Sequence, residues 1–126
     1  MDEHRIVRTY FQAYETKDRA LLESVLADNF SFKSPIDDPM NRLGYFERCW
    51  PGSEDIKKVH VLSIGVTNKE ILVHYQLEMY DGRQINNVDT FLIANGKIFA
   101  QEAFYGDPPK QMSRKEFAEL NAQLTH

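Results

Sequence analysis

Three side chains in this sequence are of types that could move a proton or polarise a bound molecule: Asp89, Tyr10 and His74. Asp89 interrupts the stretch 87–93, which is otherwise mostly apolar or β-branched and is typical of a strand. An ionised carboxylate on an apolar wall is costly unless something binds it. Asp89 therefore either faces water or lies in a cavity with a raised pKa.

Tyr10 and Tyr14 lie four residues apart, so a helix places both on one face. Either hydroxyl could donate a hydrogen bond to a ligand or could be satisfied at the rim of the core. For Tyr14 we expect the core position, whereas for Tyr10 both roles stay open. His74 could act as an acid or a base, because histidine titrates near neutral pH.

Other kinds of site lack their sequence patterns. The four histidines do not have the spacing of zinc ligands, so we expect no metal. The sequence has no glycine-rich phosphate loop and no nucleophile-elbow motif, and we expect no cofactor. Cys49, next to Trp50, is expected to be a buried thiol rather than a nucleophile.

Helical periodicity dominates the first part of the chain. Apolar residues at three- and four-residue spacing predict a helix over 2–16, and a second, shorter helix follows with Asp18 as its N-cap. Residues 30–34 alternate and predict a strand. Asp38 as a cap and Pro39 at the first helical position predict a third helix that continues to Trp50.

Strands dominate the second part of the chain. Four β-rich runs follow one another there: 56–66, 70–80, 84–93 and 98–105. The pairs Asp-Gly at 81–82 and Asn-Gly at 95–96 are strong hairpin signals. Consecutive hairpins predict an antiparallel meander, with 30–34 as a fifth strand.

Helices first and a meander afterwards predict an α+β fold. We expect a bent antiparallel meander sheet wrapped around three N-terminal helices, as in a cystatin-like α+β cone, whose open end is a natural ligand pocket. Ser113 and Glu116 form the capping box of an additional C-terminal helix, 113–124. We expect one domain, 1–126, whose core covers 2–107.

Length and composition also bound the function. A chain of 126 residues can bury a core without metal or disulfide support. The formal net charge of −4 argues against a surface for nucleic acid or for anionic membranes. The single cysteine cannot form an internal disulfide, which fits a reducing compartment. The first residues are charged and no segment could span a membrane, so we expect a cytoplasmic protein.

The order of elements and several short segments together resemble the nuclear transport factor 2-like (NTF2-like) superfamily. The segments are YFQAY at 10–14, LADNF at 26–30, GKI at 96–98 and FYG at 104–106. The superfamily includes SnoaL-type polyketide cyclases, ketosteroid isomerases, limonene-epoxide hydrolases and scytalone dehydratases. The likeness covers the chain up to Asp107 and implies a SnoaL-like cone with a pocket. Because these proteins have unrelated chemistries or none, the resemblance does not fix an activity.

Ketosteroid isomerases give the most useful comparison. Tyr10 falls where those enzymes keep the tyrosine that hydrogen-bonds the substrate oxyanion. The segment 88–91 resembles the one that holds their protonated aspartic acid, the second oxyanion donor. The resemblance therefore implies that the pKa of Asp89 lies well above that of a free aspartate.

The general base of those enzymes has no counterpart at the matching position. It is an aspartate before a proline, whereas this chain has Ser34 there. A neutral hydroxyl cannot take a proton from carbon unaided. Asp37 or Asp38, slightly further along the loop, would have to reach the pocket, although both are more typical of turn and cap residues.

The direction in which His74 points depends on the strand register. Burial of the apolar set 71, 73, 75, 77 and 79 against the helices would leave His74 outside. The ungapped match to the isomerases instead turns His74 into the pocket and frees Val73, Tyr75 and Leu77 for a homodimer contact on the outer sheet face. We expect this second arrangement.

The resulting site has Asp89, Tyr10 and His74 as candidate catalytic residues. If Asp89 faces the pocket, strand alternation puts Asn87, Phe91 and Ile93 on the same face. The expected ligand-binding residues are Tyr14, Ser34, Asp37, Trp50, Asn87, Phe91, Gln101 and Tyr105.

Two functions are compatible with this site. The first is a small-molecule binding domain that holds an apolar ligand without chemistry, which the missing base at Ser34 favours. The alternative is a cofactor-independent isomerase, cyclase, dehydratase or hydrolase acting on a small apolar, polyketide-like or steroid-like substrate. Asp89 and Tyr10 would then polarise a carbonyl or hydroxyl group, and His74 or a loop aspartate would move the proton.

Overall fold

The computed structural model describes residues 3–106 and 113–124. The first elements are α1 (Glu3–Thr16), α2 (Arg19–Val25), β1 (Leu26–Ser34), β2 (Asp37–Asn41), α3 (Arg42–Arg48) and a 3₁₀ helix (Trp50–Asp55). They are followed by β3 (Ile56–Val66), β4 (Ile71–Met79), β5 (Gln84–Ala94), β6 (Lys97–Tyr105) and α4 (Arg114–Leu124). The predicted α+β class is confirmed.

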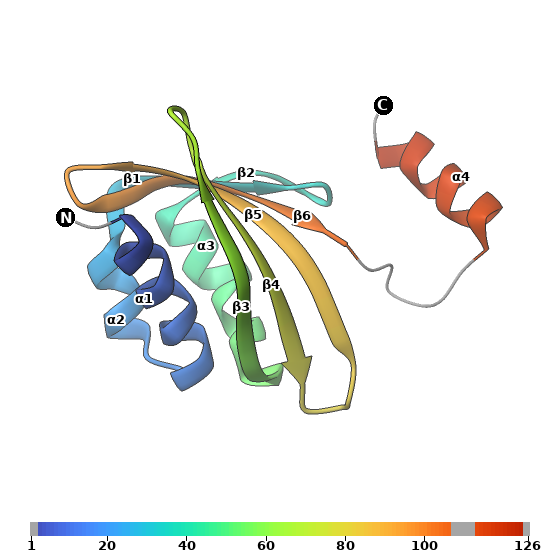
Figure 1. The fold of residues 1–126 in the computed structure, drawn as a ribbon, viewed down its shortest axis with the longest axis horizontal. Coiled ribbons are helices and arrows are strands. Elements are labelled where there is room, and N and C mark those ends of the chain that lie inside the picture. Colours follow the sequence, from blue (N-terminus) through green and yellow to red (C-terminus); the bar gives the residue numbers. More distant parts are fainter. Residues whose placement is uncertain (1–2, 107–112, 125–126) are drawn as a thin grey trace.

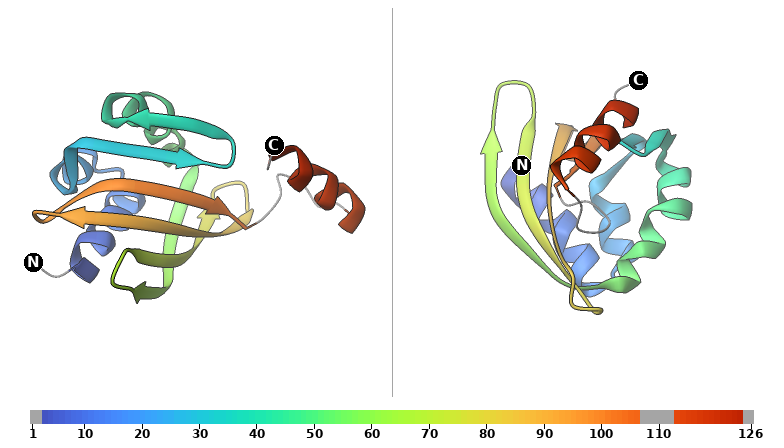
Figure 2. Two further views of the ribbon diagram at one scale, coloured as in Figure 1. Left: turned by 90° about the horizontal axis from the view of Figure 1, so that it is seen from above. Right: turned by 90° about the vertical axis from the view of Figure 1, so that its right-hand side faces the viewer.

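The strands form one sheet in the order β2-β1-β6-β5-β4-β3. The predicted meander from β3 to β6 is confirmed, and it is antiparallel throughout. The sheet as a whole is mixed, because β1 pairs in parallel with β6. Figure 1 shows α1, α2 and α3 together on one side of the bent sheet, and Figure 2 shows the strands curving around them, with α4 apart from the sheet.

The predicted caps of the second and last helices are present. Asp18 Oδ1 accepts a hydrogen bond from the Leu21 amide at 3.0 Å and so satisfies one of the free amides at the start of α2. In the capping box before α4, the Glu116 amide donates to Ser113 Oγ at 3.1 Å, and the Ser113 amide donates to Glu116 Oε1 at 3.2 Å.

The predicted start of the third helix is wrong. Residues Asp37–Asn41 form the edge strand β2, where the missing amide hydrogen of Pro39 does no harm to the ladder. The helix α3 begins at Arg42, and its N-cap is Asn41, whose Oδ1 accepts from the Gly44 amide at 2.9 Å. This shift turns Tyr45 into the core and leaves Leu43 exposed.

The predicted register of β4 is also wrong. Val73 and Tyr75 are buried on the concave face against the helices, while His74 is exposed on the convex face. Val73 pairs with Asp89, which in turn pairs with Ala103, so all three share the concave face. Burial of the apolar set outweighs any gain from a dimer contact. A homodimer, if it forms through the convex face, cannot use Val73 and Tyr75.

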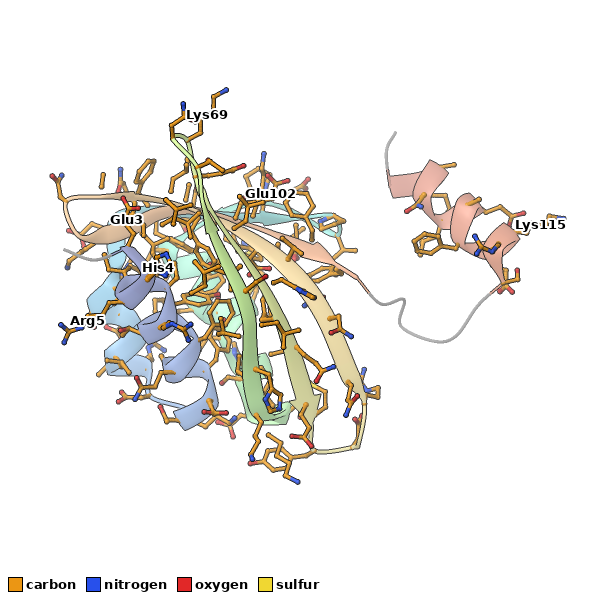
Figure 3. The ribbon with its side chains drawn as sticks, in the orientation of Figure 1. Glu3, His4, Arg5, Lys69, Glu102 and Lys115 are labelled. Atoms are coloured by element: carbon orange, nitrogen blue, oxygen red, sulfur yellow. The ribbon has the colours of Figure 1, made fainter. Side chains whose placement is uncertain are left out.

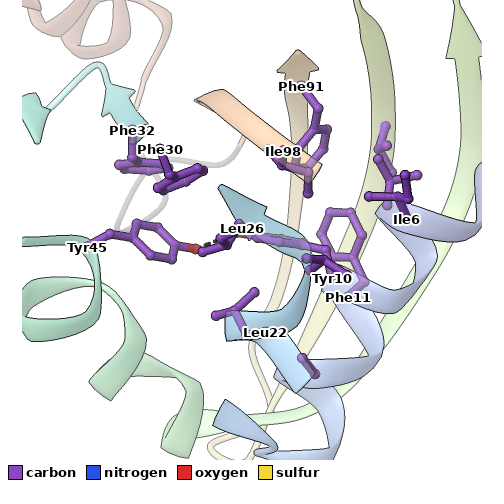
Figure 4. Packing of buried hydrophobic residues seen from close by; sticks show 14 of the residues in the cluster. Ile6, Tyr10, Phe11, Leu22, Leu26, Phe30, Phe32, Tyr45, Phe91 and Ile98 are labelled. Atoms are coloured by element: carbon purple, nitrogen blue, oxygen red, sulfur yellow. Dashed lines mark hydrogen bonds between the residues drawn. The ribbon is translucent and has the colours of Figure 1, made fainter. Parts of the chain in front are cut away.

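The concave face and the helices enclose an aromatic core (Figure 4). Tyr45 of α3 lies beneath Phe30 and Phe32 of β1, with ring centroids 5.1 Å and 5.0 Å away. On the other side, Tyr10 of α1 contacts Phe91 of β5 edge to face at 5.2 Å. Within the described residues, no helix is long and apolar enough to cross a membrane.

Candidate functional site

A cavity of about 380 Å³ lies between the concave face of the sheet and the helices α1 and α3. Its walls are largely apolar, and the residues that make them so include Phe11, Phe32, Ile56, Leu77, Met79 and Ala103. Polar groups reach it from three strands as Tyr75, Asn87, Asp89 and Gln101, and from two helices as Tyr10, Tyr14 and Tyr45. This cavity therefore combines a polar cluster with an apolar wall.

Asp89 lies in the middle of β5 and is 2% exposed. Its Oδ1 accepts a hydrogen bond from Tyr75 Oη at 2.9 Å, and its Oδ2 accepts one from Gln101 Nε2 at 2.8 Å. Burial raises the pKa of Asp89 to about 7, even though both hydrogen bonds lower it. The direction is the one that the sequence predicts, and the cause is desolvation of the charged form.

Gln101 of β6 connects Asp89 to Tyr10. The same Nε2 atom that donates to Asp89 also donates to Tyr10 Oη, at 2.7 Å. The Oε1 atom of this side chain is buried and finds no hydrogen-bond partner among the described residues. The side-chain amide of Gln101 therefore links Asp89 to Tyr10, the two residues that the sequence predicts as joint donors to a ligand.

Three tyrosine hydroxyls cluster on the helix side of the cavity. Tyr10 Oη lies 2.5 Å from Tyr45 Oη, and Tyr14 Oη is also hydrogen-bonded to Tyr45 Oη. Burial raises the pKa of each of the three phenols above the usual value. At neutral pH they are therefore uncharged hydrogen-bond donors and acceptors rather than bases.

A second chain of hydrogen bonds supports Asp89 from the other side. Asn87 Nδ2 donates to Tyr75 Oη at 3.4 Å, and Asn87 Oδ1 accepts from the Gly106 amide at 3.2 Å. Gly106 is required there, because a Cβ atom on it would lie 2.1 Å from the Asn86 carbonyl oxygen. Asn87 is one of the predicted ligand-binding residues. Tyr75 is not, because the predicted register of β4 puts it on the outer face of the sheet.

The first residue of β2 and the last residue of β6 also border the cavity. Asp37 and Tyr105 line it, and Asp37 Oδ2 accepts a hydrogen bond from Ser34 Oγ at 2.7 Å. Ser34 Oγ in turn accepts from the Asp37 amide at 3.1 Å. Cys49 lies nearby, and burial raises the pKa of its thiol to about 11, so the thiol stays protonated.

No protein-family model and no curated protein sequence matches this chain. Solved structures do match its fold. An NTF2-like protein of unknown function from Cytophaga hutchinsonii is 19% identical, with a TM-score of 0.67 over 84% of this chain and 91% of that one. This chain has an NTF2-like fold.

Two neighbours with this fold are described by an activity. A putative polyketide cyclase from Sinorhizobium meliloti is 20% identical, with a TM-score of 0.66 over 79% of this chain and 93% of that one. An epoxide hydrolase described as LEH-like, from M. tuberculosis, is 16% identical, with a TM-score of 0.66 over 81% and 80% of the two chains. At these identities the likeness concerns the NTF2-like fold.

Several of the predicted site residues lie around the cavity of this NTF2-like fold, and others do not. Those that line it are Tyr10, Tyr14, Asp37, Asn87, Asp89, Gln101 and Tyr105. Phe91 is fully buried in the core behind it, and Trp50 packs edge to face on Tyr14 with 5.0 Å between ring centroids. His74 is exposed on the opposite face of the sheet, so the expectation that it points into the cavity is wrong.

Tyr45 is the largest omission from the predicted site. The third helix predicted from Pro39 onward has Leu43 on its inner face, whereas the observed helix α3 turns Tyr45 inward. The signal that could have placed this helix is Asn41, a good N-cap residue directly before Arg42. Within residues 3–106 and 113–124, no group of three or more His, Cys, Asp or Glu side chains could hold a metal ion.

Proposed function

We propose that this domain binds a small, largely apolar molecule that carries an oxygen function, with the apolar wall of the cavity around its body and the polar cluster at its oxygen. The observation that carries this proposal is Asp89, a 2% exposed carboxylate that borders a cavity of about 380 Å³. That volume is within the range of small-molecule sites, which typically combine apolar walls with a few convergent polar groups.

The polar cluster supports this proposal because burying polar side chains costs free energy of folding, and a bound ligand would explain why they are there. Asp89, Asn87 and Gln101 are all buried, in a region where apolar side chains would avoid any desolvation cost. Perturbed titratable groups beside a cavity are typical of functional sites. A ligand that interacts with them would account for polar groups at this place.

The experiment uses 2-acetonaphthone, a flat aromatic ketone, and the fluorescence of Trp50, the single tryptophan of the chain. We expect saturable quenching, since Trp50 packs on the cavity-lining Tyr14. Leu77→Phe fills the cavity and should abolish the quenching, whereas Leu62→Phe, at a side chain that is 53% exposed, should leave it unchanged. Equal binding to both variants, or no binding to the unmodified chain, would contradict the proposal.

A cofactor-independent proton-transfer enzyme is the second candidate, and the pKa of about 7 for Asp89 favours it. A general base is most effective when its pKa lies near the working pH. The carboxylate would take a proton from the carbon next to a ketone and return it, while the electron pair is held as an enolate. This assigns Asp89 the role of the base, because its carboxylate accepts hydrogen bonds from Tyr75 and Gln101 and donates none.

Deuterium exchange at the methyl group of 2-acetonaphthone tests this second candidate. The protein should accelerate the exchange, with a rate that rises with pH to a plateau above about pH 7, where Asp89 is ionised. Asp89→Asn should remove the acceleration while the ketone still quenches Trp50. Exchange at the same rate as in buffer alone would contradict the enzyme hypothesis and leave the binding function as the proposal.

A further inference from the structure

A chain of four hydrogen bonds leads from Asp89 along the polar cluster to Tyr14. It passes through Gln101, Tyr10 and Tyr45. Every hydroxyl in it has one hydrogen, so the direction of the first bond decides the direction of the others. The direction determines which kind of ligand atom the far end can bind.

The Gln101 amide fixes the first bond. Its Nε2 atom has two hydrogens and donates one to Asp89 Oδ2 and the other to Tyr10 Oη. The buried Oε1 atom, without a partner among the described residues, accepts nothing from Tyr10. Tyr10 is therefore an acceptor toward Gln101.

The remaining hydrogens follow from Tyr10. Its own hydrogen is donated to Tyr45 Oη, 2.5 Å away. Tyr45 is 1% exposed, and its one hydrogen would be left unsatisfied in the core unless it is donated to Tyr14. Tyr14 therefore accepts from Tyr45, and its own hydrogen is not needed within this chain.

That hydrogen has two possible acceptors. The first is the Tyr10 oxygen, which also interacts with Tyr14 but already accepts from Gln101. The second is an atom of a molecule in the cavity that Tyr14 lines. A carbonyl oxygen is the stronger acceptor, because the second lone pair of a phenol oxygen is delocalised into the ring.

We propose that Tyr14 is the hydrogen-bond donor of the cavity and that the ligand presents a carbonyl oxygen to it, as an apolar ketone or ester does. This inference rests on the proposed binding function and adds the chemical class of the ligand. It differs from the expectation that Tyr10 is the donor, because Gln101 and Tyr45 engage the Tyr10 hydroxyl on both sides.

A matched pair of probes tests the proposal: 2-acetonaphthone and 2-isopropenylnaphthalene, in which a CH₂ group replaces the carbonyl oxygen. The unmodified chain should bind the ketone about fivefold more tightly than the hydrocarbon, the effect of one neutral hydrogen bond. Tyr14→Phe should lose this preference and leave the affinity for the hydrocarbon unchanged. Tyr80→Phe, at an exposed side chain outside the cavity, should retain the preference.

Gln101→Glu is the second variant, and it reverses the chain. The introduced carboxyl group shares at most one proton with Asp89 and so presents an acceptor oxygen to Tyr10. Tyr10 then donates to it, Tyr45 donates to Tyr10, and Tyr14 donates to Tyr45. The preference for the ketone should fall to about onefold although Tyr14 is still present. Infrared spectra should show the carbonyl stretch of the bound ketone at lower frequency in the unmodified chain than in this variant.

The outcomes separate the two proposals. If neither probe quenches Trp50, the binding function fails and the inference fails with it. If both probes bind the unmodified chain equally, the binding function stands and the inference is overturned. Retention of the ketone preference in Tyr14→Phe or in Gln101→Glu also overturns it. Loss of the preference in both variants, with Tyr80→Phe unchanged, supports it.

Discussion

The two faces of the sheet use similar residue types in opposite ways. On the concave face, the Asp89 carboxylate is buried, accepts hydrogen bonds from Tyr75 and Gln101, and has a pKa of about 7. On the convex face, the half-buried Glu102 (Figure 3) is labelled among the side chains of the sheet. It forms an ion pair with the exposed Lys33, with 3.5 Å between Oε1 and Nζ. Solvent screens the second carboxylate and not the first. The comparison shows that the face of the strand, rather than the residue type, gives a group its chemistry.

Phe91 and Phe104 provide the largest test of this difference. Phe91 is completely buried on the concave face, whereas Phe104 is 44% exposed. Phe91→Ala leaves a void in the core and should lower the free energy of unfolding by about 3–5 kcal/mol. In the monomer, Phe104→Ala should change it by about 0.5 kcal/mol or less. Urea unfolding of both variants measures the two values, and comparable losses would contradict the assignment of faces.

Asp89 and Glu102 provide a pH-dependent test. The pKa of Asp89 is about 7 in the folded chain, against an ordinary 3.8. Between these pH values the folded chain keeps a proton that the unfolded chain has lost, so this group makes the free energy of unfolding fall as pH rises. The change is about 4 kcal/mol over the window.

Asp89→Asn removes the titrating group. The difference in free energy of unfolding between this variant and the unmodified chain should therefore shift in favour of the variant by about 4 kcal/mol between pH 4 and pH 8. Denaturation at a series of pH values measures it. Glu102→Gln, the same change of carboxyl to amide on the convex face, is the matched control and is measured over the same pH series. A constant difference for Asp89→Asn would show an ordinary pKa.

Tyr45→Phe tests the hydroxyl cluster and has a smaller expected effect. The hydrogen bonds that Tyr45 shares with Tyr10 and Tyr14 are lost inside the cavity wall. Unfolding should become easier by about 1–3 kcal/mol, because buried polar groups lose their partner. Tyr80→Phe removes the same hydroxyl from a 67% exposed side chain and should have no measurable effect. Thermal denaturation distinguishes the two variants, and equal midpoints would contradict a buried network.

Self-association through the convex face is the last prediction and the one with the least effect on the fold. Phe104 is 44% exposed on this face, which leaves apolar surface available to a second copy. We expect a dimer that Phe104→Lys dissociates without loss of the cavity. Sedimentation velocity at micromolar concentration measures it, and a monomeric unmodified chain would contradict the expectation.

The sequence predicts the fold better than the site, and the errors have local causes. Hairpins with Asp-Gly and Asn-Gly turns are specified by neighbouring residues, and the meander from β3 to β6 is confirmed. Pro39 fits either the first turn of a helix or an edge strand, and only the pairing of β2 with β1 decides between them. Because of this ambiguity, the predicted third helix starts too early and the predicted site lacks Tyr45.

The register of β4 shows the same limit. Burial of the apolar set 71, 73, 75, 77 and 79 favours the face that the structure shows, whereas the ungapped match to the isomerases favours the opposite face, one residue out of register. The structure buries Val73 and Tyr75, and this choice exposes His74 and adds the Tyr75 hydroxyl to Asp89.

By itself the sequence determined most of the elements, the α+β class and the importance of Asp89 as a carboxylate in an apolar strand, because these depend on periodicity, turn residues and composition. Only the tertiary structure decided which side chains meet Asp89. Gln101, Tyr75 and Tyr10 come from separate elements, and their contacts depend on register and helix placement. A shift of one residue in either would have given Asp89 different partners and a different pKa.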